Sequence, residues 1–153
     1  MKWIAIVVVA LIVVIAVVAF IGSMLPRNHT ASRTLRVKRS PGEVWPVVTQ
    51  AMNTSSVPVD VLESDPPRRL VTRVKESEKM FGGTWTVTAT PADAPSTGSR
   101  QAGCTLTIVE DGWVANPVFR FVSRYVMGHH ATMDGILTSV AKTLGEPVEL
   151  SGE

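Results

Sequence analysis

The chain has 153 residues, and its 15 Lys and Arg against 13 Asp and Glu give a formal net charge of +2. The small basic excess lies mostly in residues 27–39, which argues against a nucleic-acid-binding protein, because such a protein presents a dense basic face. Cys104 is the single cysteine. It excludes an internal disulfide and a cysteine zinc site.

Residues 1–26 contain an uncharged apolar run from Trp3 to Pro26. About 20 apolar residues in a helix span the hydrocarbon core of a bilayer, so we predict one transmembrane helix and a lipid bilayer as partner. A cleaved secretory signal is the alternative, but its apolar region usually runs only about 7–15 residues. Five basic residues follow the run, which places the protein in the cell membrane with its domain in the cytoplasm. They are Arg27, Arg33, Arg36, Lys38 and Arg39.

Beyond the apolar run, we predict a polar linker at 27–32, one domain at 33–147 and a tail at 148–153. Residues 34–38 alternate apolar and polar side chains, the pattern of a half-buried strand. The segment from Ser40 to Glu43 matches a capping box with proline at the first helical position. It predicts a helix of about ten residues, shortened by Pro46.

Four further segments show the alternation of strands, near 57–62, 70–75, 84–90 and 104–108. The stretch between residues 51 and 65 has room for one strand only. Asn116 and Pro117 begin a last helix whose apolar residues keep helical spacing as far as Leu144. The order predicts an α+β domain, in which an antiparallel sheet of five to six strands wraps a long C-terminal helix.

Several motifs together resemble the START-like, polyketide cyclase/dehydrase family of helix-grip domains (SRPBCC). The Leu25–Arg27 junction is similar to that of its membrane-anchored bacterial members. The other matching segments are Ser40–Trp45 (SPGEVW), Pro66–Val71 (PPRRLV), Phe81–Thr86 (FGGTWT), Glu110–Gly112 (EDG) and Asn116–Phe121 (NPVFRF). The resemblance implies a hydrophobic cavity between the sheet and the C-terminal helix, which in many members holds lipids, sterols or aromatic polyketides.

The expected function is therefore non-catalytic binding of a small hydrophobic, lipid-like ligand. The alternatives are a scaffold module with a filled core and an enzyme of the cyclase or dehydrase kind. Aromatic side chains dominate any small core, so the aromatic residues fit either a cavity wall or ordinary packing. The predicted cavity residues are Trp45, Trp85, Val87, Leu106, Ile108, Trp113, Phe119, Phe121, Tyr125, Met133, Ile136 and Leu137.

The chemical candidates in the sequence are weak. His130 and Asp134 share a helix face beside His129, but no neighbouring side chain adds the third donor that a metal needs. Glu110 and Asp111 lie where a turn attracts acidic residues, and Cys104 lies within an apolar strand. We predict no catalytic residues, no metal and no cofactor.

Overall fold

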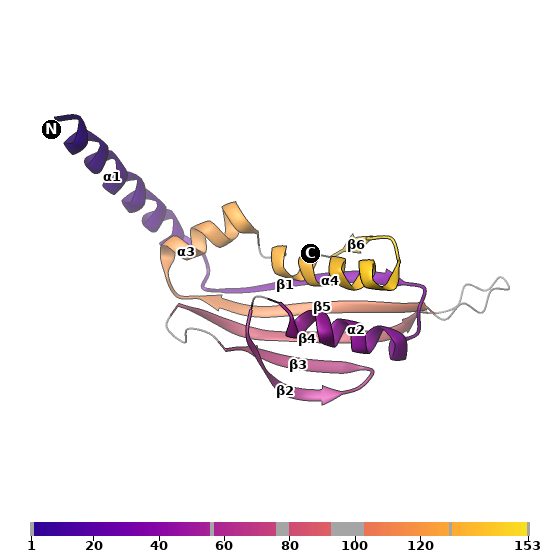
Figure 1. The fold of residues 1–153 in the computed structure, drawn as a ribbon. Coiled ribbons are helices and arrows are strands. Elements are labelled where there is room, and N and C mark those ends of the chain that lie inside the picture. The colour runs from indigo at the N-terminus through magenta and orange to yellow at the C-terminus, as the bar shows by residue number, and fades with distance from the viewer. Residues whose placement is uncertain (1, 56, 76–79, 93–102, 129, 153) are drawn as a thin grey trace.

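The computed structural model describes residues 2–55, 57–75, 80–92, 103–128 and 130–152. An N-terminal helix, α1 (Lys2–Met24), projects from a domain in which helices cover one face of a sheet (Figure 1). The sheet has six strands in the order β2-β3-β4-β5-β1-β6, and every neighbouring pair is antiparallel. The predicted α+β class and antiparallel sheet are confirmed, and the stretch between residues 51 and 65 holds one strand.

The strands are β1 (Asn28–Val37), β2 (Val59–Asp65), β3 (Arg69–Val74), β4 (Phe81–Ala92), β5 (Gly103–Val114) and β6 (Leu150–Ser151). The helices after α1 are α2 (Pro41–Asn53), α3 (Pro117–Val122), the π-helix η1 (Ser123–Met127) and α4 (Ala131–Leu144). In Figure 1, α2 and α4 lie along the sheet, while α3 and η1 lie at the end of the sheet from which α1 projects.

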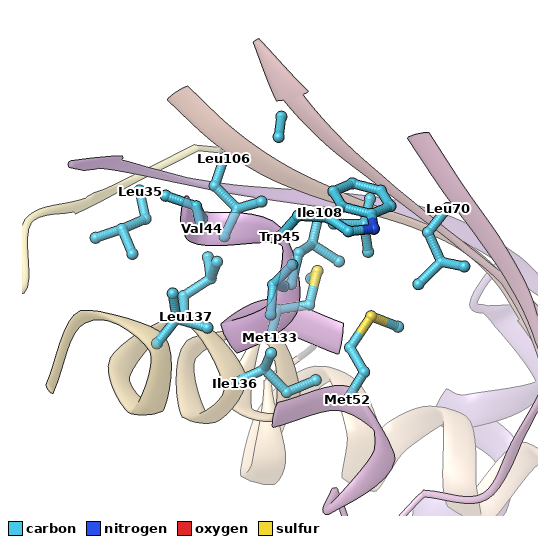
Figure 2. Close-up of a cluster of buried hydrophobic side chains, with 14 of the residues drawn as sticks. Leu35, Val44, Trp45, Met52, Leu70, Leu106, Ile108, Met133, Ile136 and Leu137 are labelled. Carbon is cyan, nitrogen blue, oxygen red and sulfur yellow. The ribbon is translucent and has the colours of Figure 1, made fainter. Parts of the chain in front are cut away.

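The core lies between the inner face of the sheet and the two helices α2 and α4. Side chains alternate along β5, so that Leu106 and Ile108 are fully buried while Thr105 and Thr107 point to the other face. Val44 of α2 and Leu137 of α4 are also fully buried. Figure 2 shows the side chains of the sheet and of both helices meeting in one packed layer. Two helices, not one, therefore fill the concave side.

The start of α2 follows from the predicted capping motif. The Glu43 carboxylate accepts hydrogen bonds from the Ser40 backbone N–H at 2.9 Å and from its hydroxyl at 2.7 Å. The helix runs 13 residues and continues through Pro46. The ten-residue estimate was thus short, because a proline near the N-terminus removes few intrahelical bonds.

The hydrogen bonds from Ser40 lower the pKa of Glu43 below its usual range. A carboxyl group with a lower pKa in the folded state stabilises the fold above its unfolded pKa, and this contribution is lost as the pH falls. We expect the difference in unfolding free energy between wild type and Glu43→Gln to shrink below about pH 4. Urea unfolding across an acid pH series measures it, and a difference that is constant with pH would contradict this assignment.

The predicted linker and tail are both part of the sheet. Strand β1 begins at Asn28, and its first residues pair with the end of β5, where His29 lies opposite Gly112 and Thr30 opposite Asp111. In the predicted tail, Leu150 pairs with Leu35. These assignments were wrong because long-range pairing with β5 and β1 orders short polar segments that show little periodicity by themselves.

The long C-terminal helix was also predicted incorrectly. The segment divides into α3, η1 and α4, and α4 has only 14 residues. Gly128 has a φ of 73°, a conformation that ends a helix. The apolar residues on either side of Gly128 have helical spacing, but the two halves of the segment pack against different parts of the molecule.

Candidate functional site

An apolar hollow of about 320 Å³ lies at the end of the sheet where β4 begins and β5 ends, next to α3 and η1. Most of its lining is apolar, and four of its lining residues are polar or charged. The apolar residues are Val57, Val74, Phe81, Trp85, Trp113, Val114, Phe119, Val122 and Met127. The polar ones are His29, Glu110, Ser123 and Thr132.

The structure brings three of the predicted cavity residues to this hollow, namely Trp85, Trp113 and Phe119. Phe121 and Tyr125 contact each other instead, with ring centroids 5.0 Å apart and ring planes tilted by 49°. The remaining predicted residues lie in the packed core, where α2 and α4 occupy the space that a central cavity would need. They are Trp45, Val87, Leu106, Ile108, Met133, Ile136 and Leu137.

A histidine and a carboxylate meet inside the apolar hollow. His29 Nε2 lies 3.6 Å from Glu110 Oε1, and the two side chains are 16 % and 21 % exposed. They come from the paired strands β1 and β5 and point to the same face of the sheet. A Cβ on Gly112 would lie 2.8 Å from the His29 ring, so the glycine provides the space that the imidazole occupies.

The pair was not predicted from the sequence, because His29 was assigned to a linker and Glu110 to a turn. The sequence did contain one signal of a longer strand. Hydroxyl side chains occupy every second position, at Thr30, Ser32 and Thr34. Alternation that continues backward from the predicted strand indicates a longer strand. It would have placed His29 on the same face as Leu35.

A second hollow, of about 260 Å³, lies at the junction between α1 and the domain. We call it the arginine hollow, because Arg27, Arg120 and Arg124 line it, together with residues 25–26 and 28–30 and with Val114 and Ser123. It shares His29, Val114 and Ser123 with the apolar hollow. The two hollows are therefore neighbours with a common wall.

The junction itself is closely packed. A Cβ on Gly22 of α1 would overlap the carbonyl of Pro117, the first residue of α3. Arg120 Nη1 donates to the Leu25 carbonyl oxygen at 2.9 Å, and Arg120 Nη2 donates to the Ala115 carbonyl oxygen at 2.9 Å. The end of α1 is thus held against α3 by close backbone contact and by a buried guanidinium.

The chemical candidates from the sequence do not come together. Asp134 Oδ1 accepts a hydrogen bond from Arg33 Nε at 2.9 Å, and His129 lies outside the described residues. Among the residues that the structure describes, no three His, Cys, Asp or Glu side chains form a metal-binding group. Cys104 is fully buried, and burial raises the pKa of its thiol to about 11.

Solved structures provide the comparison for this arrangement. A conserved protein from Geobacillus kaustophilus superposes with a TM-score of 0.57 at 11 % identity, over 80 % of this chain and 99 % of that chain. This likeness shows the fold alone. Norcoclaurine synthase from Thalictrum flavum, in complex with dopamine and hydroxybenzaldehyde, is more distant, with a TM-score of 0.46 at 10 % identity over 80 % of this chain and 90 % of that one. No family model and no curated protein sequence matches the chain.

The sheet with helices on one face is consistent with the START-like fold that the sequence motifs imply. Helix α1 is long and apolar enough to span a membrane, and the apolar window of this helix is unburied. A signal sequence near the N-terminus has the same two properties.

Proposed function

We propose that α1 holds the protein in the cell membrane and that the domain binds a small hydrophobic, lipid-like ligand in the apolar hollow. The observation that carries this proposal is a hollow with a mostly apolar wall beside a core that is otherwise filled. Ligand pockets in proteins are commonly apolar clefts of roughly 300–1,000 Å³ with a few convergent polar groups. The apolar hollow lies at the lower end of that range, which favours one alkyl chain or one small ring system.

The free energy of such binding comes from burying the apolar surface of the ligand against the apolar lining of the hollow. Each buried methylene group contributes about 0.8 kcal/mol, so about eight carbons would gain roughly 6 kcal/mol before the costs of association. His29 and Glu110 supply a polar contact at one side of the wall. This contact would orient a ligand that carries a polar end.

The surface of α3 and η1 supports the membrane part of the proposal. Four large apolar side chains on this short segment are exposed, and its first part, α3, packs against α1. They are Phe119, Tyr125, Val126 and Met127. Clustered apolar side chains at a surface indicate contact with a protein or a membrane. With α1 in a bilayer, this segment lies at the level of the headgroups, where a hydrophobic ligand can enter without crossing water.

The basic residues after α1 favour a cytoplasmic domain, as the positive-inside rule states. Protease added to sealed spheroplasts tests this orientation. The domain is expected to stay intact until the membrane is permeabilised, and cleavage from the outer side would overturn the assignment.

Filling the apolar hollow tests the binding proposal. Thr132 lines the hollow at the start of α4, whereas Thr143 is exposed near the end of the same helix. We expect Thr132→Phe to reduce photo-crosslinking of a diazirine-bearing alkyl probe to the domain by about tenfold or more, since one buried phenyl ring displaces several methylene groups. Thr143→Phe is the matched control and should label like wild type.

The measurement uses the full chain in phosphatidylcholine nanodiscs, with labelled peptides mapped by mass spectrometry. Wild-type labels are expected on peptides that contain Trp85 or Phe119. Equal labelling of the two variants, or labelling confined to α1, would overturn the proposal and favour a scaffold module.

A further inference from the structure

Arg120 carries a charge that the surrounding protein does not neutralise. Its side chain is only 8 % exposed, and its two described hydrogen bonds go to neutral carbonyl groups. Its Nε atom is buried without a hydrogen-bond partner, and none of the ion pairs within the described residues includes it. A buried charge is costly unless an opposite charge accompanies it. An anion beside Arg120 would neutralise this charge.

The arginine hollow has the composition of an anion-binding site. Arg120 forms its buried side, and the exposed Arg27 and Arg124 lie at its border. None of its described lining residues is acidic. Glu110, which pairs with His29, lines the apolar hollow and not this one. Guanidinium groups bind phosphate and carboxylate through paired, charge-assisted hydrogen bonds, and three of them line this hollow.

The two hollows fit the two ends of one molecule. They adjoin at His29, Val114 and Ser123, so a ligand that passes between these side chains would have its chain in the apolar hollow and its head beside the arginines. We infer that the ligand is an anionic single-chain amphiphile, with a phosphate or carboxylate head in the arginine hollow and its chain in the apolar hollow. This inference rests on the proposed function, since it assigns the chemical class of ligand to that same site.

Competition against the alkyl photoprobe tests the inference, again with the full chain in phosphatidylcholine nanodiscs. Dodecyl phosphate and dodecanol form a matched pair with the same chain and different heads. We expect dodecyl phosphate to displace the probe from the domain at a concentration at least about tenfold lower than dodecanol. Inorganic phosphate alone should leave the probe in place, because it lacks the chain.

A pair of exposed substitutions shows whether the arginines cause this preference. Arg27→Gln with Arg124→Gln is expected to remove most of the preference for dodecyl phosphate and to leave competition by dodecanol unchanged. The control is Arg36→Gln with Arg68→Gln, which removes the same charge from exposed positions outside both hollows. The control variant should compete like wild type. Arg120 itself is kept, because its loss would disturb the junction with α1.

The outcomes separate the two proposals. Equal competition by dodecyl phosphate and dodecanol in wild type would overturn the anionic head and leave the hydrophobic site standing. A preference that survives in the Arg27 and Arg124 variant would also overturn it. Displacement by inorganic phosphate alone would contradict the shared site for head and chain. Failure of every competitor, together with equal labelling of the Thr132 and Thr143 variants, would overturn the proposed function itself.

Discussion

Replacement of Leu106 by alanine is expected to lower the free energy of unfolding of the domain by about 3–4 kcal/mol. Leu106 is fully buried in β5, where it faces Leu35 of β1 and Ala89 of β4 across the sheet. Leu106 belongs to the packed layer between the sheet and the two helices, so the surroundings can fill only part of the space that the substitution leaves (Figure 2). The loss then includes both the transfer term and the cavity term.

Urea unfolding of the full chain in a mild nonionic detergent, followed by near-UV circular dichroism, measures this loss. The matched control is Leu62→Ala on the edge strand β2, where the leucine is 47 % exposed. An exposed substitution of this kind usually changes stability by less than about 0.5 kcal/mol. If both variants lost the same stability, the core would not be organised around β5.

Substitution of Gly22 by leucine is expected to separate the end of α1 from α3. Even a Cβ at this position overlaps the Pro117 carbonyl, and backbone atoms cannot move aside as a flexible side chain would. Overpacking of this kind costs about 1–3 kcal/mol or more, which shifts a docked arrangement toward an undocked one by roughly 5- to 150-fold. The contact between Arg120 and the Leu25 carbonyl would be lost in the undocked form.

Pulsed EPR in nanodiscs reports the docking, with one spin label at exposed Val9 of α1 and the other at exposed Asp111 of β5. Wild type should give one narrow distance distribution and Gly22→Leu a broad one. Ala16→Leu is the control, because Ala16 is exposed on the same helix. A narrow distribution in the Gly22 variant would mean that the close contact does not hold the junction together.

Local chemistry allowed much of the fold to be predicted. The starts of α2 and α3 follow from Ser40 with Glu43 and from Asn116, whose side chain accepts from the backbone N–H groups of the first helical turn. Both are interactions between residues close in sequence, so the sequence pattern contains them. The inner faces of β4 and β5 follow from alternation in the same way.

The features that escaped prediction depend on residues far apart in sequence. Asn28 to Ser32 form a strand because β5 pairs with them, and the last helix divides where its halves find different partners, α3 on α1 and α4 on α2. The apolar hollow lies at the end of the sheet, and not at its centre as predicted, because Val44 and Val48 of α2 fill the centre. The pairing of His29 with Glu110 depends on the register of β1 with β5, which alternation alone does not specify.

Only three residues separate the end of α1 at Met24 from the start of β1 at Asn28. Fully extended, this connection reaches about 14 Å, far less than the width of the domain. With α1 in a bilayer, the domain diffuses in two dimensions and stays in touch with one leaflet. A ligand of the proposed kind would therefore be taken from, and returned to, that same membrane, and would not be carried across an aqueous gap to a second one.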